Sequence, residues 1–265
     1  MRMNSPEAGR IDAPTQEPGM VRIAAVGDLH YGSEVHGVSR AQVTRLVEEV
    51  EAAADILVLC GDLTTHGKPS QATALMEAMG GLRVPTVAVL GNHEFDSGAE
   101  KEVAKVLREH GITVLDGEAV EVNGVGFAGV KGFAGGFGKA TLGAFGEPII
   151  KAFVQEALDE ALKLENALRK LATPVKVAVL HYSPTAETIQ GEPLEIQAFL
   201  GCSRLMPPLD AMQVDVVFHG HAHTGTLEGR TPGGMPIYNV ALPLLQSHGR
   251  MFHLWESRAR AAALR

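Results

Sequence analysis

The chain has 265 residues, which is long enough to bury a large core and fits one α/β domain better than two small ones. Its net charge of −8 and its pI near 5.8 disfavour nucleic acid and anionic membranes as partners. Hydrophobic residues make up 45% and charged residues 20%, as in ordinary globular proteins, and no apolar segment is long enough for a membrane span.

The composition of the two ends of the chain indicates the limits of the domain, and the number of cysteines indicates its redox compartment. Residues 1–19 contain three prolines and no apolar stretch, so we expect a disordered tail there and no signal peptide. A single domain is expected over residues 20–256, followed by a C-terminal tail over residues 257–265. Cys60 and Cys202 are too few for a disulfide framework, which fits a reducing compartment and makes a cytoplasmic location the expectation.

The first half of the chain alternates apolar strands with amphipathic helices. Strands are expected over residues 21–26, 56–60 and 86–90, and helices over about 39–54, 69–80 and 97–110. Ser39 with Gln42, and Ser97 with Glu100, have the spacing of capping boxes. This β-α-β-α-β-α series predicts a parallel sheet with right-handed crossovers, and ligands bind at the carboxyl ends of such strands.

The second half contains further strands separated by irregular segments. Asn123-Gly124 between two valine-rich runs predicts a β-hairpin, and the G-x-G-x-x-G inside it opens no helix, which rejects a dinucleotide site. The segment 131–146, rich in Gly and Phe, is either a mobile flap or a plain surface loop. A helix with a core-facing stripe is expected over about 148–171, a short one near 196–200, and strands over 175–180, 214–218, 237–240 and 251–255.

Polar side chains follow five of the apolar runs directly. The candidate metal ligands among them are Asp28, His30, Asp62, Asn92, His181, His221 and His223. Because the carboxyl ends of parallel strands meet at one edge of a sheet, we expect these side chains to form one site. Nitrogen and oxygen donors without a thiolate argue against a closed structural zinc and favour Zn, Mn, Fe or Ni. Seven donors exceed the needs of one ion and suit two metals that share a carboxylate.

A dinuclear site of this kind would be cationic and would attract phosphate. Two divalent ions outweigh the charges of Asp28, Asp62 and a bridging hydroxide, even on an acidic protein. Metals also lower the pKa of bound water, which supplies a nucleophile near neutral pH. His93 follows Asn92 directly and is the candidate catalytic donor of a proton to the leaving oxygen, with Glu94 or another acid as a candidate orienting group.

Taken together, the motifs D-x-H, G-D, G-N-H-E, H and G-H-x-H resemble the calcineurin-like metallophosphoesterase family, and they occur in its order between Val21 and Val240. The resemblance implies a four-layer α-β-β-α sandwich with two mixed sheets, in the α/β class. It implies that one metal is held by Asp28, His30, Asp62 and His223. It implies that the second metal, which shares the bridging aspartate, is held by Asp62, Asn92, His181 and His221.

The resemblance also bears on the substrate. Protein Ser/Thr phosphatases of this superfamily carry GDxxDRG, whereas residues 61–67 read GDLTTHG and lack the second aspartate and the arginine. The length and the GDLT form look closer to bacterial phosphodiesterases, including the class III cyclic-nucleotide type. The sequence therefore favours hydrolysis of a small-molecule or nucleotide phosphodiester by a metal-bridging hydroxide, with a cyclic nucleotide as one candidate. Two alternatives remain, a phosphomonoesterase acting on nucleotides or other small phosphate esters, and a non-catalytic scaffold with this fold.

The other histidines are expected to lie outside the metal centre. His219 alternates with two of the candidate ligands, and we expect it in the core or behind the ligands. His36 and His66 fall in loops after metal motifs and are expected to be solvated. The histidines at 110, 248 and 253 have no partner pattern.

Overall fold

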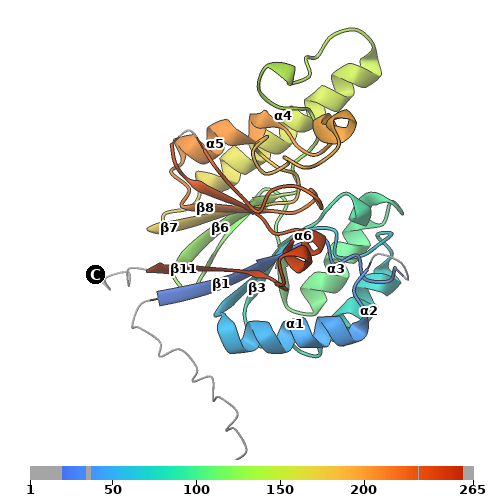
Figure 1. The fold of residues 1–265 in the computed structure, drawn as a ribbon, viewed down its shortest axis with the longest axis vertical. Helices are drawn as coiled ribbons and strands as arrows, with labels where there is room; N and C mark the ends of the chain where they lie inside the picture. The colour runs from blue at the N-terminus through green and yellow to red at the C-terminus, as the bar shows by residue number, and fades with distance from the viewer. Residues whose placement is uncertain (1–19, 34–36, 232, 259–265) are drawn as a thin grey trace, which may run out of the picture.

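The computed structural model describes residues 20–33, 37–231 and 233–258. The expected tail over residues 1–19, and residues 259–265 of the expected C-terminal tail, lie outside the described residues. Two β-sheets pack against each other, and helices cover the outer face of each, so the chain forms four layers in the order α-β-β-α (Figure 1). The expected fold class is confirmed. Among the described helices, none has the length and apolar character needed to cross a membrane.

The first sheet is built by the N-terminal half of the chain and closed by its last strand. Its order is β11-β1-β2-β3-β4, with β1 to β4 parallel and β11 antiparallel to β1. The strands are β1 (Met20–Val26), β2 (Ile56–Cys60), β3 (Thr86–Val89), β4 (Ile112–Val114) and β11 (His253–Arg258). The helices between them are α1 (Arg40–Ala53), α2 (Pro69–Met79) and α3 (Glu100–Glu109), preceded by the 3-10 turn η1 (His93–Phe95).

The second sheet has the order β5-β6-β7-β8-β10-β9, with four parallel strands at its centre and an antiparallel strand at each edge. Its strands are β5 (Glu118–Val122), β6 (Val125–Val130), β7 (Val175–Leu180), β8 (Val216–His219), β9 (Glu228–Arg230) and β10 (Pro236–Asn239). The helices of this half are α4 (Pro148–Leu168), α5 (Met206–Ala211) and α6 (Leu242–Ser247). Short 3-10 turns are η2 (Gly138–Ala140), η3 (Leu194–Phe199) and η4 (Ser203–Leu205).

Local sequence signals predict some element boundaries correctly and others wrongly. The capping box of Ser39 and Gln42 is present at the start of α1. The second expected box is wrong, because α3 begins after Ala99 and the Ser97 hydroxyl instead donates to the carbonyl oxygen of His66. The hairpin is confirmed, since Asn123 and its glycine both have positive φ between β5 and β6, as a tight two-residue turn requires.

The main core lies between the two sheets. A single cluster of buried side chains joins Val58 and Val87 of the first sheet to Phe127 and Val177 of the second. A second cluster lies where α4 packs on β6 and β7. The first turn of α4 reaches beyond the sheet (Figure 1), so Ile150 is 40% exposed, which corrects the expectation that the stripe is buried along its whole length. This packing holds the carboxyl ends of β1, β2, β3, β7 and β8 at neighbouring positions.

Candidate metal centre

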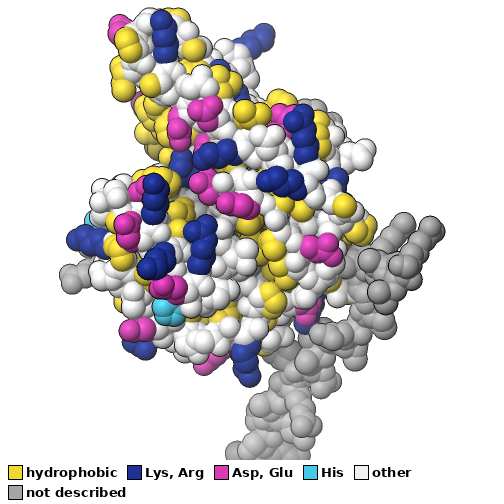
Figure 2. All heavy atoms as spheres, turned by 180° about the vertical axis from the view of Figure 1, so that it is seen from behind, with side chains coloured by type: hydrophobic (Ala, Val, Ile, Leu, Met, Phe, Trp, Pro, Cys, Tyr) yellow, Lys and Arg dark blue, Asp and Glu magenta, His cyan; other side chains and the backbone are white. Residues whose placement is uncertain are grey.

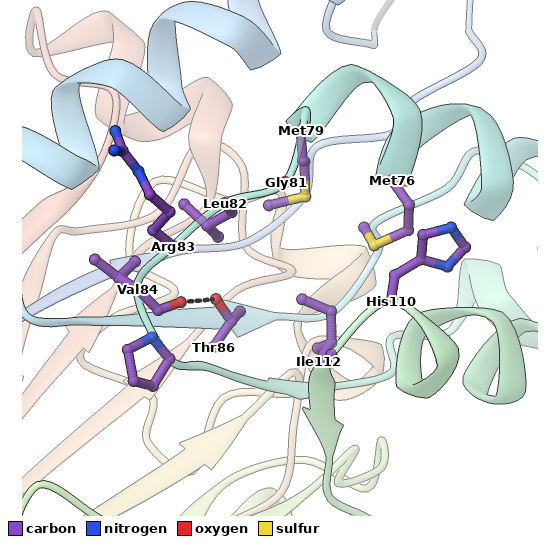
Figure 3. Close-up of a pocket in the computed structure, with 11 residues that line it drawn as sticks. Met76, Met79, Gly81, Leu82, Arg83, Val84, Thr86, His110 and Ile112 are labelled. Atoms are coloured by element: carbon purple, nitrogen blue, oxygen red, sulfur yellow. Dashed lines mark hydrogen bonds between the residues drawn. The ribbon is translucent and has the colours of Figure 1, made fainter.

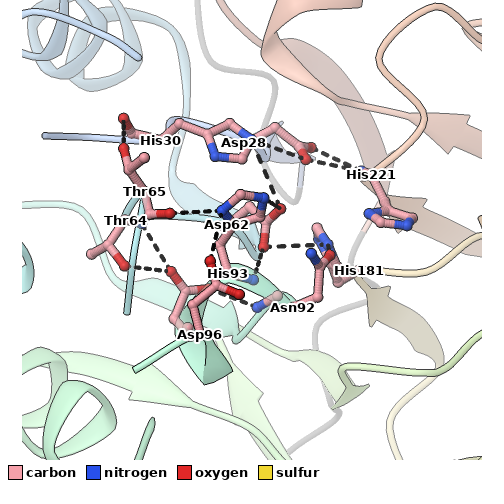
Figure 4. Close-up of polar contacts among 12 residues, drawn as sticks. Asp28, His30, Asp62, Thr64, Thr65, Asn92, His93, Asp96, His181 and His221 are labelled. Carbon is pink, nitrogen blue, oxygen red and sulfur yellow. Dashed lines mark hydrogen bonds and ion pairs between the residues drawn. The ribbon is translucent and has the colours of Figure 1, made fainter. Parts of the chain in front are cut away.

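The loops that follow five strands bring the candidate ligands together. Asp28 and His30 follow β1, Asp62 follows β2, and His181 follows β7 directly. Asn92 and His93 follow β3, and His221 and His223 follow β8. Figure 4 shows the side chains from β1, β2, β3 and β7 converging around Asp62. The loops after these strands therefore bring the candidate side chains together at the carboxyl ends of the strands.

The carboxylate of Asp62 lies between two groups of histidines. Its Oδ1 is 3.4 Å from Nε2 of His181, and its Oδ2 is 3.8 Å from Nε2 of His30. Nε2 of His93 is 3.9 Å from the same Oδ2. These distances are too long for hydrogen bonds and leave space between the carboxylate oxygens and the ring nitrogens.

The donor atoms form overlapping groups that could each hold a cation. The ligand atoms of Asp28, His30 and His223 lie within 4.8 Å of one another. Those of Asp62, His181 and His221 form a second such group. A third, formed by His30, Asp62 and His93, lies between them. The third group shares His30 with the first group and Asp62 with the second, so the three groups adjoin one another around these two residues.

Hydrogen bonds to backbone carbonyls orient two of the rings. Nδ1 of His181 is 2.9 Å from the carbonyl oxygen of Cys60, and Nε2 of His221 is 3.2 Å from that of Phe199. A carbonyl oxygen only accepts, so these nitrogens carry the hydrogen and the opposite nitrogen of each ring is a lone-pair donor. Nε2 of His181 then lies 2.8 Å from Oδ1 of Asn92, two acceptors at a separation compatible with ligands of one cation.

His30 provides the clearest test of whether a metal fits. The residue is 6% exposed. Its Nε2 is the one buried side-chain nitrogen or oxygen, among the residues that the structure describes, without a hydrogen-bond partner. Leaving a buried polar atom unsatisfied costs about 1–3 kcal/mol. A metal ion between His30 and the carboxylates of Asp28 and Asp62 would satisfy this atom.

The backbone at the ligand positions is also unusual. Asp28, His30, Asp62 and His221 have φ values of 58°, 45°, 50° and 70°. Side-chain-bearing residues rarely adopt this left-handed region, at a cost of about 1–2 kcal/mol each. Such strain is characteristic of functional sites, where the surrounding structure fixes the conformation. Here it turns four donors toward the same space.

Comparison with known proteins identifies the family. Residues 21–225 match the family described as Metallophos, calcineurin-like phosphoesterase. The chain belongs to the calcineurin-like phosphoesterase family. These enzymes are metal-dependent phosphoric ester hydrolases that normally use a dinuclear metal centre. A comparison with curated proteins gives no match.

Solved structures share the fold at low sequence identity. TT1561 of Thermus thermophilus has a TM-score of 0.53 at 15% identity, over 91% of this chain and 100% of that one. GAP50 of Plasmodium, the anchor in the inner membrane complex, has a TM-score of 0.53 at 12% identity, over 84% and 72%. A putative 5'-nucleotidase from Staphylococcus aureus, in complex with alpha-ketoglutarate, has a TM-score of 0.51 at 15% identity, over 83% of this chain but only 48% of its own.

Two glycines of this phosphoesterase allow the backbone to approach the ligands closely. A Cβ atom on Gly91 would lie 2.1 Å from Oδ1 of Asp62 and 2.3 Å from its backbone nitrogen. A Cβ atom on Gly220 would lie 2.3 Å from Oδ2 of Asp28. Gly91 and Gly220 are therefore required to be glycine, because a side chain at either position would collide with Asp62 or with Asp28.

Burial disfavours the charged form of both aspartates, but the net effect on the pKa differs between them. Burial raises the pKa of the Asp62 carboxyl well above its usual value, and the charges of Asp28 and Glu94 raise it further. Burial also acts to raise the pKa of Asp28, but the hydrogen bond from His223 and the charges of nearby histidines outweigh it and lower that pKa. Two buried carboxylates side by side are the arrangement that bound cations would stabilise.

Burial keeps most of the histidines in the neutral form that binds metals. It lowers the pKa of His30 to about 4, and it lowers the pKa of His181 and His221 as well. His223 differs, because its hydrogen bond to Asp28 outweighs burial and raises its pKa. A metal ion at this position would displace that proton.

His93 is held by groups that the sequence did not identify. Its Nδ1 lies 2.7 Å from the carbonyl oxygen of Thr65 and 3.5 Å from Oδ2 of Asp96, and its backbone N–H donates to Oδ1 of Asp62 at 2.9 Å. Glu94 is not the orienting group. Its buried carboxylate accepts hydrogen bonds from the amide and hydroxyl of Thr64 and from the amide of Gly91, and so ties the loops after β2 and β3 together.

The remaining histidines do not join the centre, as far as the structure describes them. His219 is buried and contacts the hydroxyl of Thr188 and the carbonyl of Gly220. His36 lies outside the described residues. The Gly- and Phe-rich segment 131–146 lies close to one of the ligands. The backbone amides of Gly135 and Gly136 donate to the carbonyl oxygens of Ala198 and Gly201, on either side of the Phe199 carbonyl that contacts His221. Whether that segment moves stays a hypothesis.

An open groove adjoins the first group of ligands. It has a volume of about 670 Å³ and is lined by His30, Ser33, Gly37, Thr65, His93, His223, Pro243 and Gln246. A different cavity, of about 260 Å³, lies at the amino ends of β3 and β4, on the opposite edge of the sheet (Figure 3). There, Arg83 is paired with Glu51 and Thr86 donates to the carbonyl of Val84, and none of the described residues that line this cavity is a candidate metal ligand.

Proposed function

We propose that this protein hydrolyses phosphodiesters at a dinuclear metal centre. Asp28, His30, Asp62 and His223 would hold one ion, and Asp62, Asn92, His181 and His221 the other. The observation that best supports this proposal is the position of the Asp62 carboxylate, whose two oxygens face different histidines at 3.4 and 3.8 Å. The bound ions, of which Mn, Fe and Zn are the candidates, would supply Lewis acidity to activate water and neutralise phosphate charge.

The chain's own residues supply the remaining steps. His93 lines the groove, its Nε2 lies 3.9 Å from Oδ2 of Asp62, and its Nδ1 is fixed by the Thr65 carbonyl. The ring is therefore placed to hold a proton at Nε2 and to deliver it to the leaving oxygen. A carboxylate oxygen of Asp96 lies 3.5 Å from the same Nδ1.

The charge of the site supports a diester substrate over a monoester. With two divalent ions bound, Asp28 and Asp62 neutralise only part of the positive charge, and a phosphodiester carries a single negative charge. A monoester carries nearly two near neutral pH and would benefit from a further cation. None of the eight described residues lining the groove is Lys or Arg. On the face shown in Figure 2, Lys and Arg side chains are interspersed with Asp and Glu.

Phosphomonoester hydrolysis is the second candidate. The Staphylococcus aureus neighbour described as a putative 5'-nucleotidase shares the fold, and a 5'-nucleotidase acts on a monoester. Rates on bis(p-nitrophenyl) phosphate and on p-nitrophenyl phosphate, with Mn²⁺, Fe²⁺ or Zn²⁺ added, separate the two. We expect a higher kcat/KM on the diester. A higher value on the monoester would overturn the diester assignment and leave the metal centre standing.

Metal analysis tests the centre itself and the alternative of a non-catalytic scaffold. We expect about two ions per chain in the wild type. Asp62→Asn should bind at most one ion and lose activity, and Asn tolerates the left-handed backbone at this position. His93→Asn should keep both ions and slow turnover about 10²- to 10⁴-fold. Two ions with unchanged turnover in His93→Asn would remove His93 from the mechanism.

A further inference from the structure

The groove beside His93 has walls from three distant parts of the chain. His30, Ser33 and Gly37 come from the loop after β1, and Thr65 comes from the loop after β2. The third wall is α6, which contributes Pro243 and Gln246. A volume of about 670 Å³ is within the usual range for small-molecule sites.

The position of His93 assigns this groove to the leaving group. His93 lines the groove, and under the proposed function its Nε2 donates a proton to the oxygen that departs from phosphorus. The alcohol attached to that oxygen must therefore extend from the His93 side of the centre. The groove opens beside His93, and it is also lined by His30 and His223, two of the proposed metal ligands.

The part of the groove lining that the structure describes carries no charged side chain apart from its histidines. Its described residues include no Lys, Arg, Asp or Glu, and the three histidines belong to the proposed centre. A leaving alcohol with its own phosphate or carboxylate would lose hydration there without gaining a cation. An uncharged alcohol would lose little.

Gln246 supplies the free polar group of the groove. The Thr65 hydroxyl is already used, because it donates to the carbonyl of His30 at 2.6 Å. The Gln246 side chain is exposed, and its amide nitrogen is 4.0 Å from the sulfur of Met251, a weak contact. Its amide can therefore both donate to and accept from the hydroxyl or ring atoms of an alcohol.

The helix that carries Gln246 is fixed relative to the metal ligands. The amide of Leu242, at the start of α6, donates to the carbonyl of Gly27 at 3.0 Å, and the amide of Gly27 donates to Val240 at 2.9 Å. Gly27 immediately precedes Asp28. Leu242 and Leu245 are buried, so the helix presents Gln246 from a packed element.

We propose that this groove is the leaving-group subsite, and that Gln246 makes it selective for uncharged, hydrogen-bonding alcohols such as a nucleoside or sugar hydroxyl over alcohols that carry an anionic group. The proposal rests on the proposed function. It names the substrate class as diesters whose departing alcohol is neutral. Pro243 provides the apolar surface on the same helix against which the body of that alcohol packs.

The test uses two diesters that share a methyl group and differ only in the phenol that leaves. They are methyl p-nitrophenyl phosphate and methyl 3-carboxy-4-nitrophenyl phosphate, and each rate is divided by that for alkaline hydrolysis to remove intrinsic reactivity. The metal-loaded wild type should prefer the neutral phenol by about tenfold in kcat/KM. Gln246→Ala should raise KM for the neutral diester about three- to tenfold with kcat and metal content nearly unchanged.

Gln246→Lys should narrow or invert the preference for the neutral diester, because kcat/KM on the carboxylated diester should rise about three- to tenfold. The matched control is Gln155→Lys on the exposed face of α4, which adds the same charge away from the groove and should change neither rate. Calorimetry should show that Gln246→Lys binds free 3-carboxy-4-nitrophenol more tightly than the wild type does. This binding does not depend on turnover.

The outcomes separate the two hypotheses. If the neutral diester is hydrolysed but the preference is the same in the wild type, Gln246→Lys and Gln155→Lys, the subsite is wrong and the phosphodiesterase proposal stands. If neither diester is hydrolysed while p-nitrophenyl phosphate is, the diester assignment fails and the subsite falls with it. A wild-type preference for the carboxylated phenol would also overturn the selectivity.

Discussion

Nδ1 of His93 lies 3.5 Å from a carboxylate oxygen of Asp96, three residues further along the chain. His93 opens the turn η1, and Asp96 follows its last residue, so the pair is set by the local backbone. The Thr65 carbonyl, 2.7 Å from the same nitrogen, is the closer partner. The ring is thus oriented by one backbone group and one half-exposed charge.

Replacing Asp96 with Asn removes the charge and keeps the size. We expect kcat on bis(p-nitrophenyl) phosphate to fall about three- to tenfold, because Nδ1 of His93 loses its carboxylate neighbour while the Thr65 carbonyl still orients the ring. Metal content and KM should be unchanged. Asp159→Asn, on α4, is the control. Loss of metal from Asp96→Asn would show that the carboxylate supports the centre and does not assist proton transfer.

Glu94 is expected to support the fold of the site. Its buried carboxylate accepts hydrogen bonds from Thr64 and Gly91, and the amide of Gln would place an N–H against one of these donors. Glu94→Gln should lower the free energy of unfolding by about 2–3 kcal/mol, measured in urea, and weaken metal binding. Glu195→Gln, at an exposed position, should do neither. Full stability in Glu94→Gln would contradict this role.

The sequence identified the side chains at the strand ends because their placement follows from topology. Parallel strands present their carboxyl ends at one edge, so Asp28, Asp62 and His181 could be grouped without knowing any contact. The supporting groups could not be found in this way. Thr65 acts through a backbone carbonyl that every residue has, and Gln246 lies on a six-residue helix with too few turns for a periodic pattern.

Elements of the fold were missed for the same reason. Strands β4 and β9 have three residues each, too few to show alternation, and they are strands because a neighbouring strand pairs with them. The helix α5 contains Pro207 and Pro208 in its first turn, where proline is tolerated, although the pair resembles an irregular segment. The misassigned cap at Ser97 reflects competition from the carbonyl of His66.

Gly91→Ala should damage the metal centre from outside the set of ligands. The added Cβ would lie 2.3 Å from the backbone nitrogen of Asp62, which cannot move without shifting β2. We expect a loss of about 2–4 kcal/mol in stability and metal binding reduced to at most one ion. Gly143→Ala is the matched control, because its Cβ would meet only the Phe145 ring at 3.4 Å. Metal content and thermal unfolding of both variants decide the matter, and two bound ions in Gly91→Ala would refute the steric argument.

Asp55 should make the stability of the protein depend on pH independently of the metal centre. It pairs with Arg22 through contacts of 3.0 and 3.2 Å and also accepts from the Arg22 amide, and these hydrogen bonds lower the pKa of Asp55. A lowered carboxyl pKa stabilises the fold above the unfolded pKa near 3.9, and this contribution is lost as the pH falls through the folded value. Asp55→Asn should therefore cost about 1–2 kcal/mol at pH 7.

The difference between Asp55→Asn and the wild type should start to shrink as the pH falls below about 4, where the carboxyl of the unfolded chain takes up a proton, and should vanish once the pH is below the lowered pKa of the folded carboxyl. Urea unfolding at pH 7 and at successively lower pH values measures this difference. Metal content and turnover at pH 7 should match the wild type, because the pair joins β1 to the turn before β2, at the opposite ends of these strands from Asp28 and Asp62. A stability difference that stayed constant with pH would mean that the side chain contributes through its shape and not through its charge.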